Sequence, residues 1–84
     1  RSLVAEGVLD SLDLSEEYSI SEIEVPKSWI GKSLAGLNAR SAFGVSVIAI
    51  RRDGNVSVNI DPNALFHEDD SIYVLGDNAS MEKL

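Results

Sequence analysis

The side chains that could carry out chemistry are few in this chain, and they form no complete catalytic or metal-binding pattern. The only histidine, His67, stands beside a run of three acidic residues at positions 68–70. The run lacks the Asp/Asn and Gly spacing of a calcium loop, so it is typical of a solvated loop. With one histidine and no cysteine, the chain has no set of zinc ligands, no reactive thiol and no disulfide. We expect no metal site and no nucleophile–base pair here.

Two further patterns fall short of an enzyme's active site. The Gly-Lys-Ser sequence at residues 31–33 matches the end of a phosphate-binding loop, but the glycine required five residues earlier is Pro26. Glu22 and Glu24 alternate along a predicted strand, and we interpret their shared face as the solvent side rather than as a glycosidase pair. The chain is therefore predicted not to be an enzyme.

The arginines are the remaining candidates for binding. Arg40 is an isolated cation just ahead of the most hydrophobic segment, and Arg51 and Arg52 follow that segment. A guanidinium offers planar, two-pronged hydrogen bonding to a phosphate or a carboxylate. Arg40 is therefore either an anion ligand or the partner of a neighbouring acidic residue, and the sequence leaves both interpretations open.

Length and composition limit the kind of domain that can position these arginine side chains. The chain has 84 residues, 44% of them hydrophobic, which is ordinary for one small globular domain. Its formal net charge is −7, which argues against a nucleic-acid surface, because phosphates must be met by clustered Lys and Arg. No apolar run approaches the roughly 18 residues that a membrane-spanning helix needs.

The N-terminal segment carries a helical pattern. Apolar residues in residues 2–14, including Val8, Leu9 and Leu12, are spaced mostly by three, four and one, which predicts a short amphipathic helix. Gly7 weakens that helix, so it needs a partner surface. Either it packs on its own domain, or it is a connector from a missing upstream domain; the absence of an initiator Met suggests a chain cut from a longer one. We divide the chain into a connector, residues 1–17, and a domain, residues 18–84.

The rest of the chain reads as a small sheet with short helices. Residues 18–25 predict a strand with a bulge near residues 21–22, ended by Pro26. Ser33 is expected to cap a short helix with Leu34 and Leu37 facing inward, and Phe43-Gly44 to end it.

Three more strands and a final helical turn are predicted in the second half. Residues 45–50 are almost continuously apolar, which predicts a strand covered on both faces and hence a homodimer. Asp53-Gly54 is typical of a tight hairpin turn, with residues 55–60 as the returning strand. Residues 71–75 form the last strand, and Asn78 caps a terminal turn through Met81 and Leu84. The fold class is α+β.

Four segments in this order resemble the TrkA-C (RCK-C) domain, the small regulatory lobe of proteins that gate potassium channels and transporters. They are residues 25–34 (VPKSWIGKSL), 37–40 (LNAR), 43–54 (FGVSVIAIRRDG) and 70–76 (DSIYVLG). The resemblance covers about residues 18–84. Residues 1–17 are similar to the connector that follows the nucleotide-binding lobe in Ktr-type cytosolic gating subunits. The resemblance implies a small antiparallel or mixed sheet with short helices that pairs about a two-fold axis.

The resemblance also implies a ligand and a set of ligand-binding residues. Paired lobes in such proteins can bind cyclic di-AMP between subunits, and this two-fold symmetric ligand suits identical half-sites. Laid on this chain, the family's binding pattern falls on Leu34, Ala35, Asn38, Arg40, Ser46, Val47 and Pro62. Asn38 and Ser46 stand where the family has Asp and Asn, and Ala64 stands where it has a polar residue after the proline.

The function implied is a ligand-sensing regulatory domain of a cytosolic gating subunit that controls a potassium transporter or channel. Its implied partners are a second copy, an upstream nucleotide-binding lobe and a membrane transporter subunit, with no nucleic acid. The domain would need no cofactor of its own and would lie in the cytoplasm at the inner face of the cell membrane. The alternative is a purely structural dimerisation module with no small-molecule site.

Overall fold

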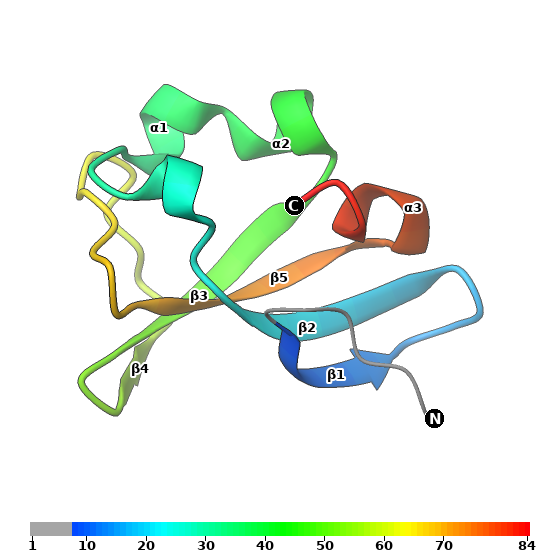
Figure 1. Ribbon diagram of the computed structural model, residues 1–84. Coiled ribbons are helices and arrows are strands. Elements are labelled where there is room, and N and C mark those ends of the chain that lie inside the picture. The colour runs from blue at the N-terminus through cyan, green and yellow to red at the C-terminus, as the bar shows by residue number, and fades with distance from the viewer. Residues whose placement is uncertain (1–7) are drawn as a thin grey trace.

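A five-stranded antiparallel sheet carries the fold of residues 8–84, the part of the chain that this computed structural model describes. Its strands lie side by side in the order β1-β2-β5-β3-β4 (Figure 1). They are β1 (Val8–Asp13), β2 (Tyr18–Glu24), β3 (Ser46–Arg52), β4 (Asn55–Ser57) and β5 (Ser71–Asp77). Short helices join them, which confirms the predicted α+β class.

The helices are all short, and α1 and α2 lie over one face of the sheet (Figure 1). They are the 3-10 turn η1 (Lys27–Trp29), α1 (Leu34–Leu37), α2 (Ala39–Phe43) and α3 (Asn78–Met81). Within residues 8–84, no helix has the length and apolar character needed to cross a membrane.

The core lies between the sheet and the α1–α2 layer. Ile72 and Val74 of the central strand β5 are fully buried, and Trp29 is only 1% exposed. The Trp29 ring packs against Phe43 and Phe66, with centroids 5.5 and 5.7 Å away, which is an ordinary spacing for aromatic pairs. This aromatic cluster fixes the α1–α2 layer, which carries most of the candidate binding residues, onto the sheet.

The predicted N-terminal helix is wrong for residues 8–13, which form β1 and pair antiparallel with β2. Val8 pairs with Ile23 and Asp10 with Glu22, so Leu9 is an extra residue at a bulge. A bulge breaks the two-residue alternation of a strand, and the resulting apolar spacing resembles that of a helix. Residues 2–7 of the predicted helix lie outside the described residues. The division of the chain after residue 17 stays a prediction.

The predicted bulge in the second strand is also wrong, because β2 pairs with β5 in unbroken register from Tyr18 to Glu24. The irregularity lies across the ladder, in β1. Ser19 and Ser21, rather than the neighbouring apolar residues, point to the buried side with Ile23. Each serine hydroxyl has a hydrogen-bond partner on another segment, so their burial leaves no unpaired polar group.

The predictions for the Ser33 cap, the end of the helix at Gly44 and the Asp53-Gly54 turn are confirmed. The Ser33 hydroxyl accepts a hydrogen bond from the Gly36 N–H at 3.1 Å and caps α1, as expected. Gly44 ends α2 with a φ of 76°, a left-handed conformation that favours glycine. Asp53 and Gly54 both have positive φ, at 54° and 80°, as a tight hairpin turn requires.

Two boundary predictions differ from the structure. The returning strand ends at Ser57 rather than at residue 60, and Val58 is 71% exposed. Asn78 is the first residue of α3 and not its cap, because Asp77 occupies the cap position. The Asn78 side-chain amide instead donates to the carbonyl of Glu16 at 3.0 Å, which ties α3 to the β1–β2 turn.

Candidate functional site

The candidate binding residues lie on three pieces of chain: α1 with its link into α2, the start of β3, and the loop that follows β4. The structure brings the first and third together, because the Ala35 N–H donates to the Pro62 carbonyl at 2.9 Å. Leu34 and Val47 are half-buried, and both pack against the hydrophobic core. Ala35, Asn38, Arg40 and Pro62 are exposed.

Asn38 sets the direction of the chain between α1 and α2. It has a φ of 52°, in the left-handed region that asparagine tolerates better than most residues. Its N–H donates to the Leu34 carbonyl, and its own carbonyl accepts from the Ala42 N–H, both at 2.9 Å. The Asn38 side chain caps neither helix. Asn38 therefore acts through its backbone, by orienting the helix that carries Arg40.

Arg40 is the cation of this surface. It is exposed on α2, and no ion pair forms on it among residues 8–84. The interpretation in which Arg40 pairs with a neighbouring acid thus finds no support in the described part of the chain. Within residues 8–84, no carboxylate therefore neutralises the Arg40 guanidinium.

Ser46 is placed differently from the other candidates. Its cross-strand neighbour is Leu75, and it lines a surface hollow of about 630 Å3 together with Tyr18 and Leu75. Neither Arg40 nor Pro62 lines that hollow. Within one chain, the Ser46 hydroxyl and the Arg40 guanidinium therefore do not share this pocket.

Among residues 8–84, no strand pairs with the outer edge of β3 near Ser46. β5 pairs with β3 along one side, but β4 pairs only with residues 50–52 on the other. No strand of the described residues covers the outer edge of residues 46–49. At this edge Ile48 sits at a bulge and is 38% exposed. The helices α1 and α2 lie over a face of the sheet and leave this edge of β3 without a strand partner among the described residues.

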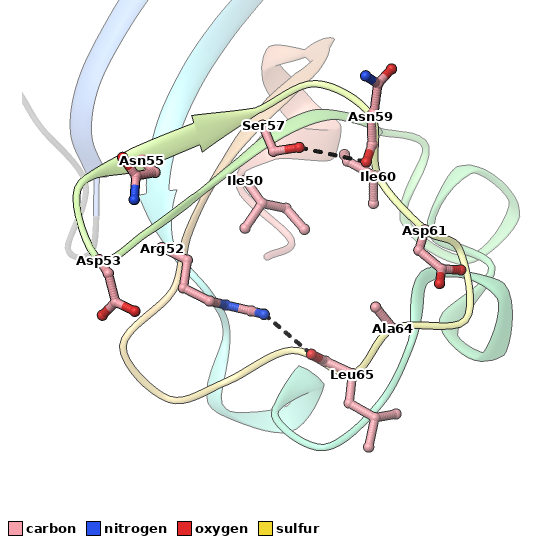
Figure 2. A pocket seen from close by; sticks show the side chains of 10 residues that line it. All are labelled: Ile50, Arg52, Asp53, Asn55, Ser57, Asn59, Ile60, Asp61, Ala64 and Leu65. Atoms are coloured by element: carbon pink, nitrogen blue, oxygen red, sulfur yellow. Dashed lines mark hydrogen bonds between the residues drawn. The ribbon is translucent and has the colours of Figure 1, made fainter.

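A second hollow opens beside the candidate loop, between the β3–β4 hairpin and residues 58–66 (Figure 2). Its volume is about 430 Å3. Ile50, Ile60 and Leu65 contribute apolar surface, and Asp53 and Asp61 contribute carboxylates. Figure 2 shows the Arg52 side chain reaching into this hollow toward the Leu65 carbonyl.

Arg51 and Arg52 each form an ion pair that was not predicted from the sequence. Arg52 donates from Nε and Nη2 to the two carboxylate oxygens of Asp70, at 2.7 and 2.6 Å. Arg51 donates from Nε to Glu22 at 3.0 Å and also to the Tyr73 hydroxyl. Adjacent residues of a strand point to opposite faces, so the two arginines serve different faces of the sheet. Both arginines thus differ from Arg40, which has no ion pair among residues 8–84.

These pairs shift the ionisation of the carboxylates. Hydrogen bonds from Arg52 hold the pKa of Asp70 below its ordinary value, although burial acts to raise it. Burial also acts to raise the pKa of Glu22, but hydrogen bonds from Ser71 and Arg51 together outweigh it and lower that pKa. Both carboxylates are therefore charged at neutral pH.

The other acidic residues of the described part of the chain do not gather into a metal-binding cluster. Within the described residues, no three His, Cys, Asp or Glu side chains come close enough to hold a metal. His67 is exposed, as expected for a solvated loop, and its N–H donates to the Asp70 carboxylate at 2.8 Å.

Comparison with known proteins gives one family match along most of the chain. The TrkA-C domain family matches residues 20–84. Ktr system potassium uptake protein A of Bacillus subtilis (strain 168) is 31% identical over 83 residues, covering 99% of this chain and 37% of that protein. Ktr system potassium uptake protein C of the same organism is 35% identical over 75 residues, covering 89% of this chain and 34% of that protein. The chain thus spans little more than a third of these relatives.

Solved structures show the same fold. The RCK C domain of the potassium transport protein KtrA, in complex with cyclic di-AMP, matches with a TM-score of 0.75 and 26% identity, covering 83% of this chain and 82% of that one. The RCK_C domain dimer of Streptococcus agalactiae BusR with cyclic di-AMP matches with a TM-score of 0.64 and 27% identity, covering 73% and 83%. BusR with its busAB-promoter DNA matches with a TM-score of 0.65 and 28% identity, covering 73% and 31%.

Proposed function

The chain belongs to the TrkA-C domain family, and from this membership we propose that it is a ligand-sensing dimerisation domain of a cytosolic gating subunit for potassium uptake. We propose cyclic di-AMP as its effector, bound between two copies. The observation that carries this proposal is the exposed Arg40, without an ion pair among residues 8–84, on the helix that directly follows α1. The KtrA and BusR domains of the same fold were solved with cyclic di-AMP.

The proposed half-site combines one cation with an apolar surface. Leu34, Ala35 and Pro62 lie together at the start of α1 and offer a surface on which an adenine base can rest. Arg40 lies on α2, the next helix along the chain, and its guanidinium supplies hydrogen-bond donors for a phosphate. A cyclic dinucleotide has two bases and two phosphates related by a two-fold axis, so two identical half-sites match it.

The open edge of β3 supports the dimer. An unpaired strand edge presents free N–H and C=O groups and is a template for another chain. Residues 46–49 are such an edge, and Ser46 and Val47 lie at its start. Pairing along this edge would bring the β3 strands of the two copies together, and with them the two Ser46 residues.

The proposed mechanism is a shift between two relative orientations of the paired domains. A ligand that contacts both copies stabilises the orientation in which both half-sites meet it, by its difference in affinity for the two states. An upstream nucleotide-binding lobe would transmit this change to a transporter subunit in the membrane. The domain itself would work at the cytoplasmic face.

Calorimetric titration of the 84-residue chain with cyclic di-AMP tests the proposal. We expect one ligand per two chains, and a dimer in sedimentation at micromolar concentration. Arg40→Ala removes a charge-assisted hydrogen bond from each half-site, each contributing about 1.5–3 kcal/mol, so binding should weaken by at least a hundredfold. Lys83→Ala, an exposed cation at the far end of the chain, is the control. Absence of both heat and thermal shift with the wild type would refute the proposal.

A structural dimerisation module is the second candidate function. It is favoured by Ala64, which brings no polar group to the loop beside Pro62, and by the placement of Ser46 in a separate hollow. A stable dimer that binds no cyclic dinucleotide would select this function. DNA binding, which BusR shows in its solved complex, is disfavoured here by the net charge of −7.

A further inference from the structure

The loop between β4 and β5, residues 58–70, carries Pro62 in a stretch that has little packing of its own. Residues 61–65 are exposed, and the hollow of about 430 Å3 lies on their inner side (Figure 2). Dense side-chain contacts therefore cannot fix where this stretch lies. Its position must come from polar anchors.

Backbone contacts anchor the loop to the segment that leads into α1. The Pro62 carbonyl accepts from the Ala35 N–H at 2.9 Å. The Phe66 N–H donates to the Lys32 carbonyl at 2.8 Å, and the Phe66 carbonyl accepts from the Gly31 N–H at 2.9 Å. The buried Phe66 ring packs on Trp29. Phe66 thus fixes the middle of the loop. The position of Pro62 depends on how residues 63–65 are held.

Arg52 holds the loop at two positions that flank Phe66 in the chain, Leu65 and Asp70. The Asp70 side chain is only 1% exposed and accepts both Arg52 bonds as well as the His67 N–H. The same guanidinium donates from Nη2 to the Leu65 carbonyl at 3.3 Å. One side chain from β3 therefore holds the end of the loop and the residue just before Phe66. We name the Arg52–Asp70 pair with its bond to Leu65 the loop clamp.

We propose that the loop clamp is a positioning device for the binding surface at α1, and that it sets effector affinity without touching the effector. This inference rests on the proposed function. Leu65 is three residues from Pro62, so a loop released at Leu65 can move at Pro62. The Ala35 N–H is one of the donors at the start of α1 that no helical carbonyl can satisfy. Without the Pro62 carbonyl, the Ala35 N–H of the four-residue helix α1 would lose its hydrogen-bond acceptor. This helix leads through Asn38 to Arg40.

A change in effector binding on substitution of Arg52 would not come from the loss of its positive charge. The Asp70 carboxylate neutralises it at 2.6 Å, so the pair presents little net charge to a distant phosphate. Substitution by lysine keeps the positive charge and removes the planar fork that reaches Asp70 and Leu65 together. Arg52→Lys therefore separates positioning from charge.

Arg51→Lys is the matched control. It makes the same exchange at the next residue, in an ion pair with Glu22 on the opposite face of the sheet. Arg51 donates to Glu22 and Tyr73, neither of which belongs to the loop. Two quantities are compared in both variants: the hydrogen-exchange rate of the Ala35 amide by NMR without ligand, and the dissociation constant for cyclic di-AMP. All measurements are made well below the melting temperature of the least stable variant.

We expect Arg52→Lys to speed exchange at the Ala35 amide and to weaken binding, each by about tenfold, while Arg51→Lys changes neither by more than about twofold. Equal effects of the two variants, or weaker binding with unchanged Ala35 exchange, would overturn the loop clamp. If Arg52→Lys does not fold, Asp70→Asn, which keeps the side-chain shape, takes its place in both measurements. If the wild type binds no cyclic di-AMP, the proposed function fails, while Ala35 exchange still decides whether the clamp holds the loop.

Discussion

Removing Arg52 should destabilise the fold by far more than removing Arg51, because only Arg52 neutralises a buried carboxylate. Asp70 has 1% of its side chain exposed, whereas Glu22 has 13%. Arg52→Ala leaves the Asp70 carboxylate buried with the His67 N–H as its remaining donor. Losing one partner of a buried pair costs about 3–5 kcal/mol. Arg52 itself is 38% exposed, so water weakens the pair, and we expect the low end, about 3 kcal/mol.

The destabilisation should depend on pH in a defined direction. In the wild type the pKa of Asp70 is lowered, so its stabilising contribution is present above the ordinary aspartate pKa and is lost as pH falls through the folded value. In Arg52→Ala, burial without the guanidinium should raise that pKa instead. Protonation then removes the buried charge, so the gap in unfolding free energy between wild type and variant should shrink on acidification from about pH 7 to about pH 4.5.

Urea unfolding followed by tryptophan fluorescence measures this gap directly, since Trp29 is the only tryptophan and is 1% exposed. Arg51→Ala is the control, and its pair with the more exposed Glu22 should contribute clearly less to stability, because solvent screens exposed ion pairs. A loss below about 1 kcal/mol for Arg52→Ala, or a loss that does not change with pH, would refute the role assigned to the buried Asp70 carboxylate.

Three further predictions concern the fold. Deleting residues 1–14 should lower the Tm by at least about 10 °C, because β1 pairs along β2 and Val8 packs on the core; an unchanged Tm would show β1 to be dispensable. Gly44→Ala should cost about 1–3 kcal/mol in urea unfolding, since φ is 76° and the new Cβ would lie 2.7 Å from the Ser80 hydroxyl oxygen. Ile72→Ala should cost about 2–5 kcal/mol, whereas Val58→Ala, at 71% exposure, should stay within about 0.5 kcal/mol; similar values for both would contradict the assigned core.

The candidate site could be predicted only in part from the sequence. The family spacing led to Arg40 and Pro62, and the structure places Pro62 against α1 and leaves Arg40 exposed. The loop clamp was not predicted, although Arg51 and Arg52 were noted as candidate anion ligands. Which acid an arginine meets depends on strand register: Arg51 lies opposite Ser71 in β5, and that register brings its guanidinium to Glu22 across the sheet.

Features whose energies are local could be predicted from the residues alone. The Ser33 cap, the turn at Asp53 and Gly54, and the end of α2 at Gly44 depend on the backbone preferences of one or two residues. The strands around residues 45–50 and 71–75 followed from apolar runs long enough to require burial. These signals also sufficed for the α+β class.

Tertiary structure decided where those preferences were weak or conflicting. Residues 8–13 carry a helical spacing, yet they form a strand, because the edge of β2 offers backbone partners that the segment alone lacks, and Leu9 is accommodated as a bulge. Ser19 and Ser21 turn inward for the same reason, since the register of β2 against β5 sets which side each residue faces. Pairing between strands joins residues far apart in the chain, so its free energy is absent from any short stretch of sequence.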